Sequence, residues 1–260
     1  WGKDLAINKG RYNFDQIKFI YFLDDSVALQ AFLSGDIDVR QENTAKTWAT
    51  SYVGKAVKDG KITLSEIPNS LPTGMQGFIY NTRRPVFADK NVREALAYAF
   101  DFEWSNKQFA YGAYARTVSY FSNSELASFG LPEGAELEIL NEYKDQLPAE
   151  IFTTEYMTPE SDGTGNNRKM LRKATQILDE AGWHLGNDKI REKNGVRLSF
   201  EIIIQNQAFE RWFNPFIQNL KKIGVEATLR VLDTAQYQNR LNDFDFDMTV
   251  SSFGQSNSPG

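Results

Sequence analysis

Residues 198–232 read LSFEIIIQNQAFERWFNPFIQNLKKIGVEATLRVL. The first seven residues form a short run of aromatic and β-branched side chains, which predicts a buried strand. Large apolar residues then recur at helical spacing over 209–220, and Gly224 supplies a stop for that helix. We expect Pro215 near the start of the helix, where a missing N–H costs nothing. A second apolar run at 228–232 predicts another strand, so this stretch indicates an α/β fold.

Further elements of the same two kinds are expected on both sides of this stretch. Asp89 is placed to cap a helix with an apolar stripe, because a carboxylate accepts from the free N–H groups of a first turn. The remaining expected elements are a helix over 167–181, a helix within 43–60, strands over 61–67 and 74–80, and a loop-rich region over 121–164.

Two stretches, one near each end of the chain, share one order of elements. Each has an apolar run, then an aspartate that can cap a short helix, then a second run that ends in an aspartate. The spacing from Asp24 to Asp38 equals that from Asp233 to Asp247. This match indicates two related strand–helix–strand units or a chance agreement between ordinary α/β segments. The strands expected here lie at 17–22, 37–39, 228–232 and 244–247.

Composition excludes several classes of function. The chain has 260 residues, a net charge of −5 and no block of lysine and arginine, which argues against a nucleic-acid surface. It contains no cysteine, so disulfides, thiol nucleophiles and cysteine-ligated zinc are excluded. No run approaches the ~20 apolar residues of a membrane-spanning helix. The single histidine, His184, directly follows a helix stop, where a surface or capping role is favoured over catalysis.

Asp243, Asp245 and Asp247 alternate with two phenylalanines. On a strand this alternation would place the three carboxylates on one face, where they could bind a divalent cation or act in glycoside hydrolysis. An amphipathic strand with its phenylalanines in the core explains the same alternation and is favoured. The run from Asp162 to Asn167 lacks the ligand spacing of a calcium loop, and a turn before a helix explains it. No metal and no cofactor are predicted.

Arg116, Ser119 and Tyr120 share one loop. An arginine with hydroxyl groups can clamp a carboxylate or a peptide backbone. The same residues also suit an ordinary connection, and the sequence favours neither interpretation.

Several ordered motifs resemble those of the extracellular solute-binding proteins of family 5, which deliver oligopeptides to ABC importers. They span nearly the whole chain. The segments around the loop of Arg116 are similar to the YejA-like branch of that family. The matching segments are 28–38 (ALQAFLSGDID), 78–82 (FIYNT), 85–96 (PVFADKNVREAL), 99–103 (AFDFE), 178–183 (LDEAGW), 220–225 (LKKIGV) and 246–247 (FD), with 116–121 (RTVSYF), 123–127 (NSELA) and 162–168 (DGTGNNR) for the branch.

The resemblance implies a fold, a partner and a compartment. It implies a type II periplasmic binding protein fold, in which a mixed sheet is flanked by helices. Residues 1–66 would be the C-terminal part of the first lobe with the hinge strand at 61–67, and residues 67–260 most of the second lobe. The start at Trp1 and the loop residues at the end agree with a fragment of a two-lobe protein. The expected whole is a monomeric, non-enzymatic periplasmic protein that binds oligopeptides, docks on ABC permease subunits and binds no nucleic acid.

The resemblance also implies where a ligand would bind. Relatives commonly place a tryptophan and an acidic residue after the strand that ends in FD, and the acid pairs with the amino terminus of a peptide. Phe253 supplies an aromatic ring here, and no carboxylate follows within 251–257. The candidate ligand-binding residues are Arg116, Ser119, Tyr120, Asn206, Phe253, Gln255, Ser256 and Asn257.

Two alternatives to a binding protein stay open. A secreted hydrolase of peptides or glycans would use Asp243, Asp245 and Glu210 as its acids. A structural or scaffold domain would have no small ligand.

Overall fold

The computed structural model describes residues 2, 4–11 and 13–258, and the chain divides into two compact units, Trp1–Ser65 and Glu66–Gly260. The division lies beside the boundary expected after residue 66. The assignment of each unit to a lobe stays a prediction. Trp1 and the last two residues, which entered the expectation of a fragment, lie outside the described residues.

The first unit is helical. Helix α1 (Asp25–Ser34) begins as predicted, because the Asp24 carboxylate accepts from the N–H groups of Ser26 and Val27. It ends at Gly35, whose φ of 90° is left-handed. The single helix predicted within 43–60 is split in two. The other helical elements of this unit are the 3₁₀ turn η1 (Ala6–Asn8), α2 (Ala45–Ser51) and α3 (Lys55–Lys58).

The strands predicted for the first unit are wrong. Residues 17–22, 37–39 and 61–67 have no strand assignment, and Phe19, Tyr21 and Leu23 are exposed. A strand requires a hydrogen-bonded neighbour, and the described residues of this unit form no sheet. The short aromatic and β-branched run at 17–22 therefore did not identify a paired strand.

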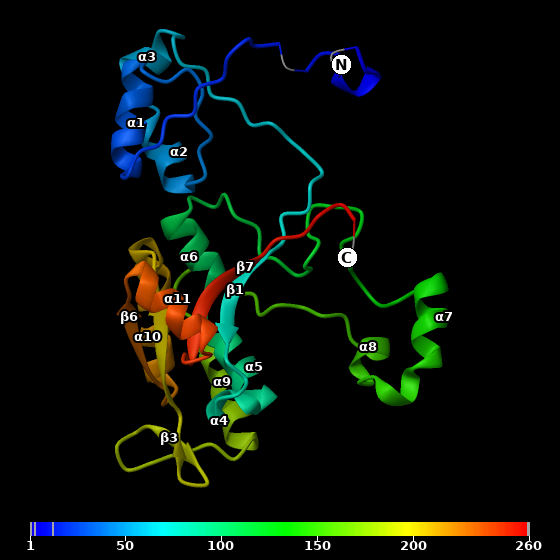
Figure 1. The fold of residues 1–260 in the computed structure, drawn as a ribbon. Helices are drawn as coiled ribbons and strands as arrows, with labels where there is room; N and C mark the ends of the chain where they lie inside the picture. Colours follow the sequence, from blue (N-terminus) through cyan, green and yellow to red (C-terminus); the bar gives the residue numbers. More distant parts are fainter. Residues whose placement is uncertain (1, 3, 12, 259–260) are drawn as a thin grey trace. The chain divides into compact units, whose positions relative to one another are not determined.

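The second unit contains a four-stranded mixed sheet. Its strand order is β1-β7-β5-β6, in which β5 runs parallel to β6 and β7 while β1 runs antiparallel to β7. Figure 1 shows β1 and β7 side by side. The strands are β1 (Met75–Tyr80), β5 (Ser199–Ile204), β6 (Glu226–Val231) and β7 (Met248–Phe253).

Helices cover both faces of this sheet. Ile202 and Ile204 point into the main core with residues of α5, α9 and α10, whereas Ile203 points to the other face, where Tyr237 and Leu241 of α11 pack. The alternation follows from the period of two along a strand, and it explains why β5 is apolar on both sides. The helices of the unit are α4 (Pro85–Ala88), α5 (Lys90–Ala99), α6 (Phe102–Phe109), α7 (Gly134–Glu142), α8 (Glu150–Thr153), α9 (Arg168–Glu180), α10 (Glu210–Lys222) and α11 (Thr234–Asn242), with 3₁₀ turns η2 (Lys144–Gln146) and η3 (Gln207–Phe209). A small antiparallel sheet joins β2 (His184–Leu185), β3 (Arg191–Lys193) and β4 (Val196–Arg197).

Most elements predicted for the second unit are confirmed, and their caps are the predicted ones. Asp89 accepts from the Asn91 N–H at the start of α5, and Asp233 accepts from the Gln236 N–H at the start of α11. The region 121–164 is mostly loop, with α7 and α8 inside it, and neither helix contains a buried residue.

Pro215 lies inside α10 and not at its start, contrary to the prediction. Helix α10 begins earlier, at Glu210, because η3 leads directly into it. Pro215 is the sixth residue of α10, so it removes one intrahelical N–H bond. The buried Phe213 and Phe216 nevertheless hold the helix against the core.

Residues 244–247 do not form the predicted strand. Phe244 has a φ of 53°, and the Asp245 N–H donates to the Arg240 carbonyl at 2.8 Å, so the chain turns before β7 begins at Met248. Asp243, Asp245 and Asp247 therefore do not share a strand face. The predicted pair of matching units is also incomplete: β6, α11 and β7 form one, whereas the stretch around α1 has no strands.

Candidate ligand-binding site

The parallel strands of the second unit end at one common edge. Strands β5, β6 and β7 end at Ile204, Val231 and Phe253, and the antiparallel β1 begins there, with Met75 opposite Phe253. In open α/β sheets, ligands bind beyond the carboxyl ends of the strands. This carboxyl edge is therefore where a site is expected, and Phe253 and Asn206 both belong to it.

Phe253 is positioned by a close approach of two backbones. Gly74 has a φ of 68°, and a Cβ atom built on it would lie 2.3 Å from the Phe253 carbonyl oxygen. A glycine is required here both for the left-handed φ and for the space. The Phe253 ring packs edge-on against Tyr120, with ring centroids 5.9 Å apart. Their exposed fractions are 42% and 50%, so this predicted pair presents ring surface to solvent.

The loop that carries Tyr120 is held by its own hydroxyl groups. The buried Ser119 Oγ accepts from the N–H groups of Phe121 at 3.2 Å and Ser128 at 3.3 Å. Ser122 Oγ donates to the Ser119 carbonyl at 2.8 Å, and Ser124 Oγ donates to the Phe121 carbonyl at 2.7 Å. These bonds fix the loop with little freedom left.

The same loop is tied to the segment that enters β1. Asn123, in a left-handed conformation with φ 69°, donates from its side-chain amide to the carbonyls of Asn69 and Leu71, both at 3.0 Å. The Thr73 N–H donates to the Ser122 carbonyl at 2.9 Å. Three segments distant in sequence are thereby joined at the carboxyl edge.

A hollow of about 590 Å³ lies against this frame. It contains Asn257, one of the predicted binding residues, and Glu125, which sequence reasoning missed. Glu125 belongs to the segment 123–127, which the sequence analysis interprets only as a mark of the branch of the family. The hollow is lined by Ser70, Asn123, Ser124, Glu125, Leu126, Phe129 and Asn257.

Arg116 points into the protein. Its Nη1 donates to the Pro159 carbonyl at 2.8 Å, and its guanidinium carbon lies 5.5 Å from the ring centroid of Phe102 and 5.8 Å from that of Phe100. Burial lowers the pKa of Arg116, against the opposing charge of Glu103. Arg116 is not among the residues that line the hollow.

The other predicted residues form local contacts at or after the strand ends. The Asn206 side chain accepts from the Ala208 N–H at 2.9 Å and caps η3. Ser256 Oγ donates to the Ser258 carbonyl at 2.6 Å, and Gln255 is half-buried. The structure thus brings Tyr120 and Phe253 together and puts Asn257 in the hollow. It turns Arg116 and Ser119 toward backbone groups.

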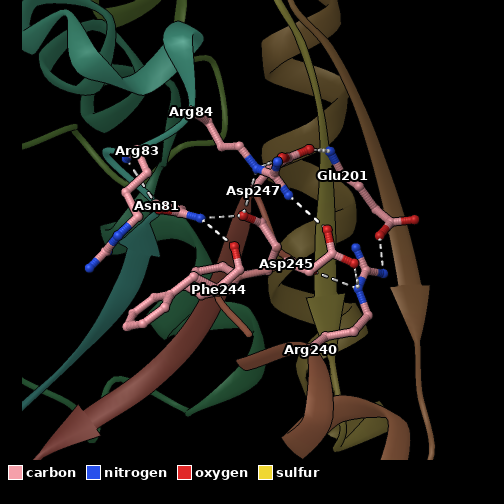
Figure 2. Close-up of polar contacts among 9 residues, drawn as sticks. Asn81, Arg83, Arg84, Glu201, Arg240, Phe244, Asp245 and Asp247 are labelled. Carbon is pink, nitrogen blue, oxygen red and sulfur yellow. Dashed lines mark hydrogen bonds and ion pairs between the residues drawn. The ribbon is translucent and has the colours of Figure 1, made fainter. Parts of the chain in front are cut away.

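Asp245 and Asp247 lie elsewhere, just before the start of β7 (Figure 2). Arg84 pairs with Asp245 at 2.9 Å and with Asp247 at 3.0 Å. Arg240 pairs with Glu201 at 2.5 Å. These carboxylates are neutralised by neighbouring guanidinium groups, as expected of a cluster that holds a turn in place.

A buried amide completes this cluster. The Asn81 side chain is 3% exposed and donates to the carbonyls of Phe244 at 2.9 Å and Phe246 at 2.8 Å. Arg83 lies over the Phe244 ring, with its guanidinium carbon 3.8 Å from the ring centroid. Figure 2 shows how Asn81 and Arg84 reach from the end of β1 across the turn before β7.

Glu210 is not gathered with Asp245, as the hydrolase alternative would require. Asp245 lies just before β7, whereas Glu210 begins α10 after the carboxyl end of β5. A six-residue strand spans roughly 17–20 Å, beyond the ~5–9.5 Å that separates the carboxyl groups of glycosidases. No group of three or more metal-ligating side chains occurs within 2, 4–11 and 13–258. Asp162 accepts from the N–H and hydroxyl of Thr164 and closes a turn.

Residues 1–260 match the family model of bacterial extracellular solute-binding proteins, family 5 Middle. The chain is 46% identical over 263 residues to the "probable peptide-binding protein YejA" of Agrobacterium fabrum, covering all of this chain and 43% of that protein. It is 43% identical over 249 residues to YejA of Escherichia coli, covering 95% of this chain and 41% of that protein. It is also 41% identical to the "peptidoglycan-binding protein YepA" of Agrobacterium fabrum, covering all of this chain and 44% of that protein.

Solved structures of the same fold are more distant in sequence. NikA from Brucella suis has a TM-score of 0.60 at 22% identity, over 92% of this chain and 41% of NikA. The oligopeptide-binding protein AppA from Bacillus subtilis, solved with a nonapeptide, has a TM-score of 0.56 at 23% identity, over 91% of this chain and 40% of AppA. These likenesses show the type II periplasmic binding protein fold predicted from the sequence.

The chain spans about two fifths of the length of the curated relatives that it matches. In the part of the chain that is described, no helix has the length and apolar character required to cross a bilayer. The match to the family model extends over the full sequence, and two relatives, at 46% and 43% identity, carry the YejA name. The chain belongs to the bacterial extracellular solute-binding proteins of family 5 and is YejA-like.

Proposed function

We propose that the full-length protein that contains this chain captures oligopeptides in the periplasm and delivers them to an ABC transporter. Residues 1–66 would belong to the first lobe and residues 67–260 to the second. The support is the family match over the whole chain, the peptide-binding name of the relative from Agrobacterium fabrum and the fold shared with AppA. The working protein would be a monomer that binds its ligand without changing it.

The carboxyl edge is the observation that carries this proposal. It presents the exposed rings of Tyr120 and Phe253 beside a hollow with Asn257, on a loop fixed by hydrogen bonds. Extended peptides bind through backbone hydrogen bonds, with pockets that accept side chains of varied size. Tyr120, Phe253 and Asn257 would contact ligand, with Asn206, Gln255 and Ser256 along the same edge. Arg116 and Ser119 would support the loop from within.

Delivery would depend on a change of shape. A ligand that binds a closed form more tightly than an open one shifts the population toward the closed form. The permease would recognise that form, and a few residues within 61–67, which have no regular structure, would act as the hinge.

Native mass spectrometry of the full-length protein, purified without refolding, tests the capture of peptides. We expect a set of bound masses that fragment as peptides, and a smaller radius of gyration by X-ray scattering when a peptide mixture is added. Bound masses that contain sugar would shift the ligand class to peptidoglycan fragments. Failure to bind any member of a peptide library, with no bound masses, would contradict the proposal.

Release of shortened peptides during the same incubation would favour the hydrolase. Asp245→Asn separates these cases further. In a binding protein this substitution should change stability alone, because Asp245 pairs with Arg84 and Arg240. In a hydrolase that used Asp245 as its acid, it would abolish turnover.

A further inference from the structure

A second hollow, of about 270 Å³, is lined by residues of α6 and α10 and by Gly165 of the loop before α9. We propose that this α6–α10 hollow binds a neutral ring that carries hydroxyl groups and has the size of a monosaccharide. The hollow shares no lining residue with the one at the carboxyl edge, and none of the candidate peptide-binding residues lines it. The proposal is therefore independent of peptide capture.

Buried polar side chains gather at the α6–α10 hollow. Asp101, Ser105 and Asn219 line it, with exposed fractions of 6%, 1% and 8%. They are three of the eight buried polar or charged residues in the part of the chain that the structure describes. Sites for small molecules combine a few precisely placed polar groups with apolar walls. This concentration of buried polar groups distinguishes the hollow from an ordinary gap between two surface helices.

The Ser105 hydroxyl forms no bond that holds the fold together. The Ser105 N–H donates to the Asp101 carbonyl at 3.1 Å, but its hydroxyl has no hydrogen bond with any described residue. A serine inside a helix can instead donate to the carbonyl one turn earlier, as Ser34 of α1 does to Gln30. A buried hydroxyl without a partner is unfavourable and requires an explanation. Because Ser105 lines the hollow, a ligand bound there would supply the missing partner.

The charged groups of the hollow also retain hydrogen-bonding capacity. Asp101 Oδ1 accepts from the Trp104 N–H at 3.1 Å and from the Ser161 hydroxyl at 2.5 Å, whereas Oδ2 accepts from no described residue. Lys222 Nζ donates to Asn219 Oδ1 at 3.0 Å and has two further N–H groups. One carboxylate and one ammonium give the lining no net charge. This balance favours a neutral ligand over a cation or an anion.

Aromatic side chains form another part of the wall. Phe100, Trp104 and Phe216 line the hollow. Gly165, with a φ of 80°, lies so close to the indole that a Cβ atom built on it would be 2.8 Å from Cδ1 and from Nε1 of Trp104. A glycine is therefore required for the loop before α9 to close against this ring.

A monosaccharide matches these features together. Each of its hydroxyl groups both donates and accepts, as the Ser105 hydroxyl, the free Asp101 oxygen and the Lys222 ammonium require. The C–H groups of its ring carry the partial positive charge that the face of an aromatic ring attracts. The volume lies just below the ~300–1,000 Å³ of sites that hold drug-sized ligands, so one ring fits.

Saturation-transfer NMR of the full-length protein with D-glucose, D-galactose or D-mannose tests the site. We expect saturation transfer to the ring hydrogens of at least one of these hexoses. The signal should persist in Tyr120→Ala, because Tyr120 belongs to the carboxyl edge and does not line the α6–α10 hollow. A hollow that holds only water would give no transfer to any of the three sugars, and that result would overturn the proposal.

Ser105→Ala removes the unbonded hydroxyl. It should weaken hexose binding about threefold to tenfold and leave the urea unfolding midpoint unchanged, because no hydrogen bond within the protein is lost. Asp101→Asn keeps an acceptor for the cap of α6 and should weaken binding about tenfold. Ser51→Ala, at the end of α2, is the matched control and should leave the affinity unchanged. Equal affinity of wild type and Ser105→Ala would overturn the site, as would a loss of hexose binding in Tyr120→Ala alone.

Free leucine is the competing probe, because a zwitterion could pair its two charges with Asp101 and Lys222. Transfer to leucine that Ser105→Ala weakens, without transfer to any hexose, would contradict a neutral ring as the ligand. Peptide affinity, measured by calorimetry, should be the same in wild type and Ser105→Ala. A lower peptide affinity in Ser105→Ala would show that the two hollows are not independent and would contradict the proposal.

Discussion

The two ends of strand β7 use polar residues in opposite ways. Before its first residue, Asp245 and Asp247 pair with Arg84, and the buried Asn81 satisfies two carbonyls of the turn. At its last residue, Phe253 packs edge-on against Tyr120, and both rings are partly exposed to solvent. The amino end therefore pairs its charged groups with one another, whereas the carboxyl end leaves aromatic surface open.

The largest effect on stability is expected at the amino end. Asn81→Ala removes both donors to the carbonyls of Phe244 and Phe246, and an unsatisfied buried polar group costs about 1–3 kcal/mol. We expect the free energy of unfolding to fall by about 2–4 kcal/mol in urea denaturation of the full-length protein. Asn141→Ala, in the exposed α7, should change it by less than about 0.5 kcal/mol. If Asn81→Ala and Asn141→Ala lowered the free energy of unfolding by similar amounts, Asn81 would not hold the turn before β7.

The next effect tests how the carboxyl edge is positioned. Gly74→Ala puts a methyl group 2.3 Å from the Phe253 carbonyl oxygen at a left-handed φ, which should cost about 1–3 kcal/mol of stability. Gly77→Ala, within β1, is the control, because no atom outside its chain neighbours lies within 4 Å of its Cβ position. We expect Gly74→Ala to lower peptide affinity as well, by displacing Phe253. If the two alanine variants had the same unfolding curve, the backbone around Gly74 and Phe253 would accommodate the added methyl group without a loss of stability.

A smaller, pH-dependent effect is expected at Asp89, which follows α4 near the end of β1. Burial alone would raise the pKa of Asp89, but hydrogen bonds from the Asn91 N–H and from Lys193 bring it below its usual value. A lowered folded-state pKa stabilises the protein above the unfolded value of about 3.9 and loses that contribution as pH falls through the folded value. Asp89→Asn should therefore cost about 1 kcal/mol near pH 7 and progressively less below about pH 4.

Thermal unfolding from pH 7 to pH 3 measures that difference. Asp145→Asn, at an exposed aspartate of η2, provides the comparison and should show no such trend. A difference between wild type and Asp89→Asn that stayed constant across this range would exclude the proposed electrostatic origin.

The smallest change in stability is expected at the carboxyl edge itself. Tyr120 is half-exposed and packs edge-on against Phe253, so Tyr120→Ala should alter the free energy of unfolding by about 0.5 kcal/mol. Calorimetry should nevertheless show about tenfold weaker peptide binding, because a contact ring is removed. Asn81→Ala is the reciprocal control: it should change stability much more than affinity. If Tyr120→Ala lost more stability than affinity, and Asn81→Ala more affinity than stability, the division of roles between the two ends of β7 would be contradicted.

Helices were predicted better than strands, and the two matching stretches show why. Asp24 and Asp233 both cap helices as predicted, because a cap depends on a few neighbouring residues. The apolar runs beside them differ: 228–232 lies largely within β6, next to β5, whereas 17–22 has no partner strand among the described residues. A short apolar run indicates that a segment can form a strand, but only a neighbour supplies its hydrogen bonds.

The candidate site was predictable in part. Tyr120 was named for the chemistry of its loop, and Phe253 and Asn257 through a family resemblance. The structure pairs the rings of Tyr120 and Phe253 at the carboxyl edge and puts Asn257 in the hollow. Arg116 was named for its chemistry, but the Pro159 carbonyl that it binds is distant in sequence. Glu125 was missed because its environment is built from Ser70 and Asn257, which no local spacing connects to it.

The sequence by itself determined the family, the α/β class and the helices with their caps, because these depend on ordered motifs and on contacts within a few residues. The tertiary structure alone decided which apolar runs became paired strands and which carboxylates were neutralised. Pairing and neutralisation require groups far apart in the chain to meet, as Asn81 does with the turn before β7 and Asn123 with the segment before β1.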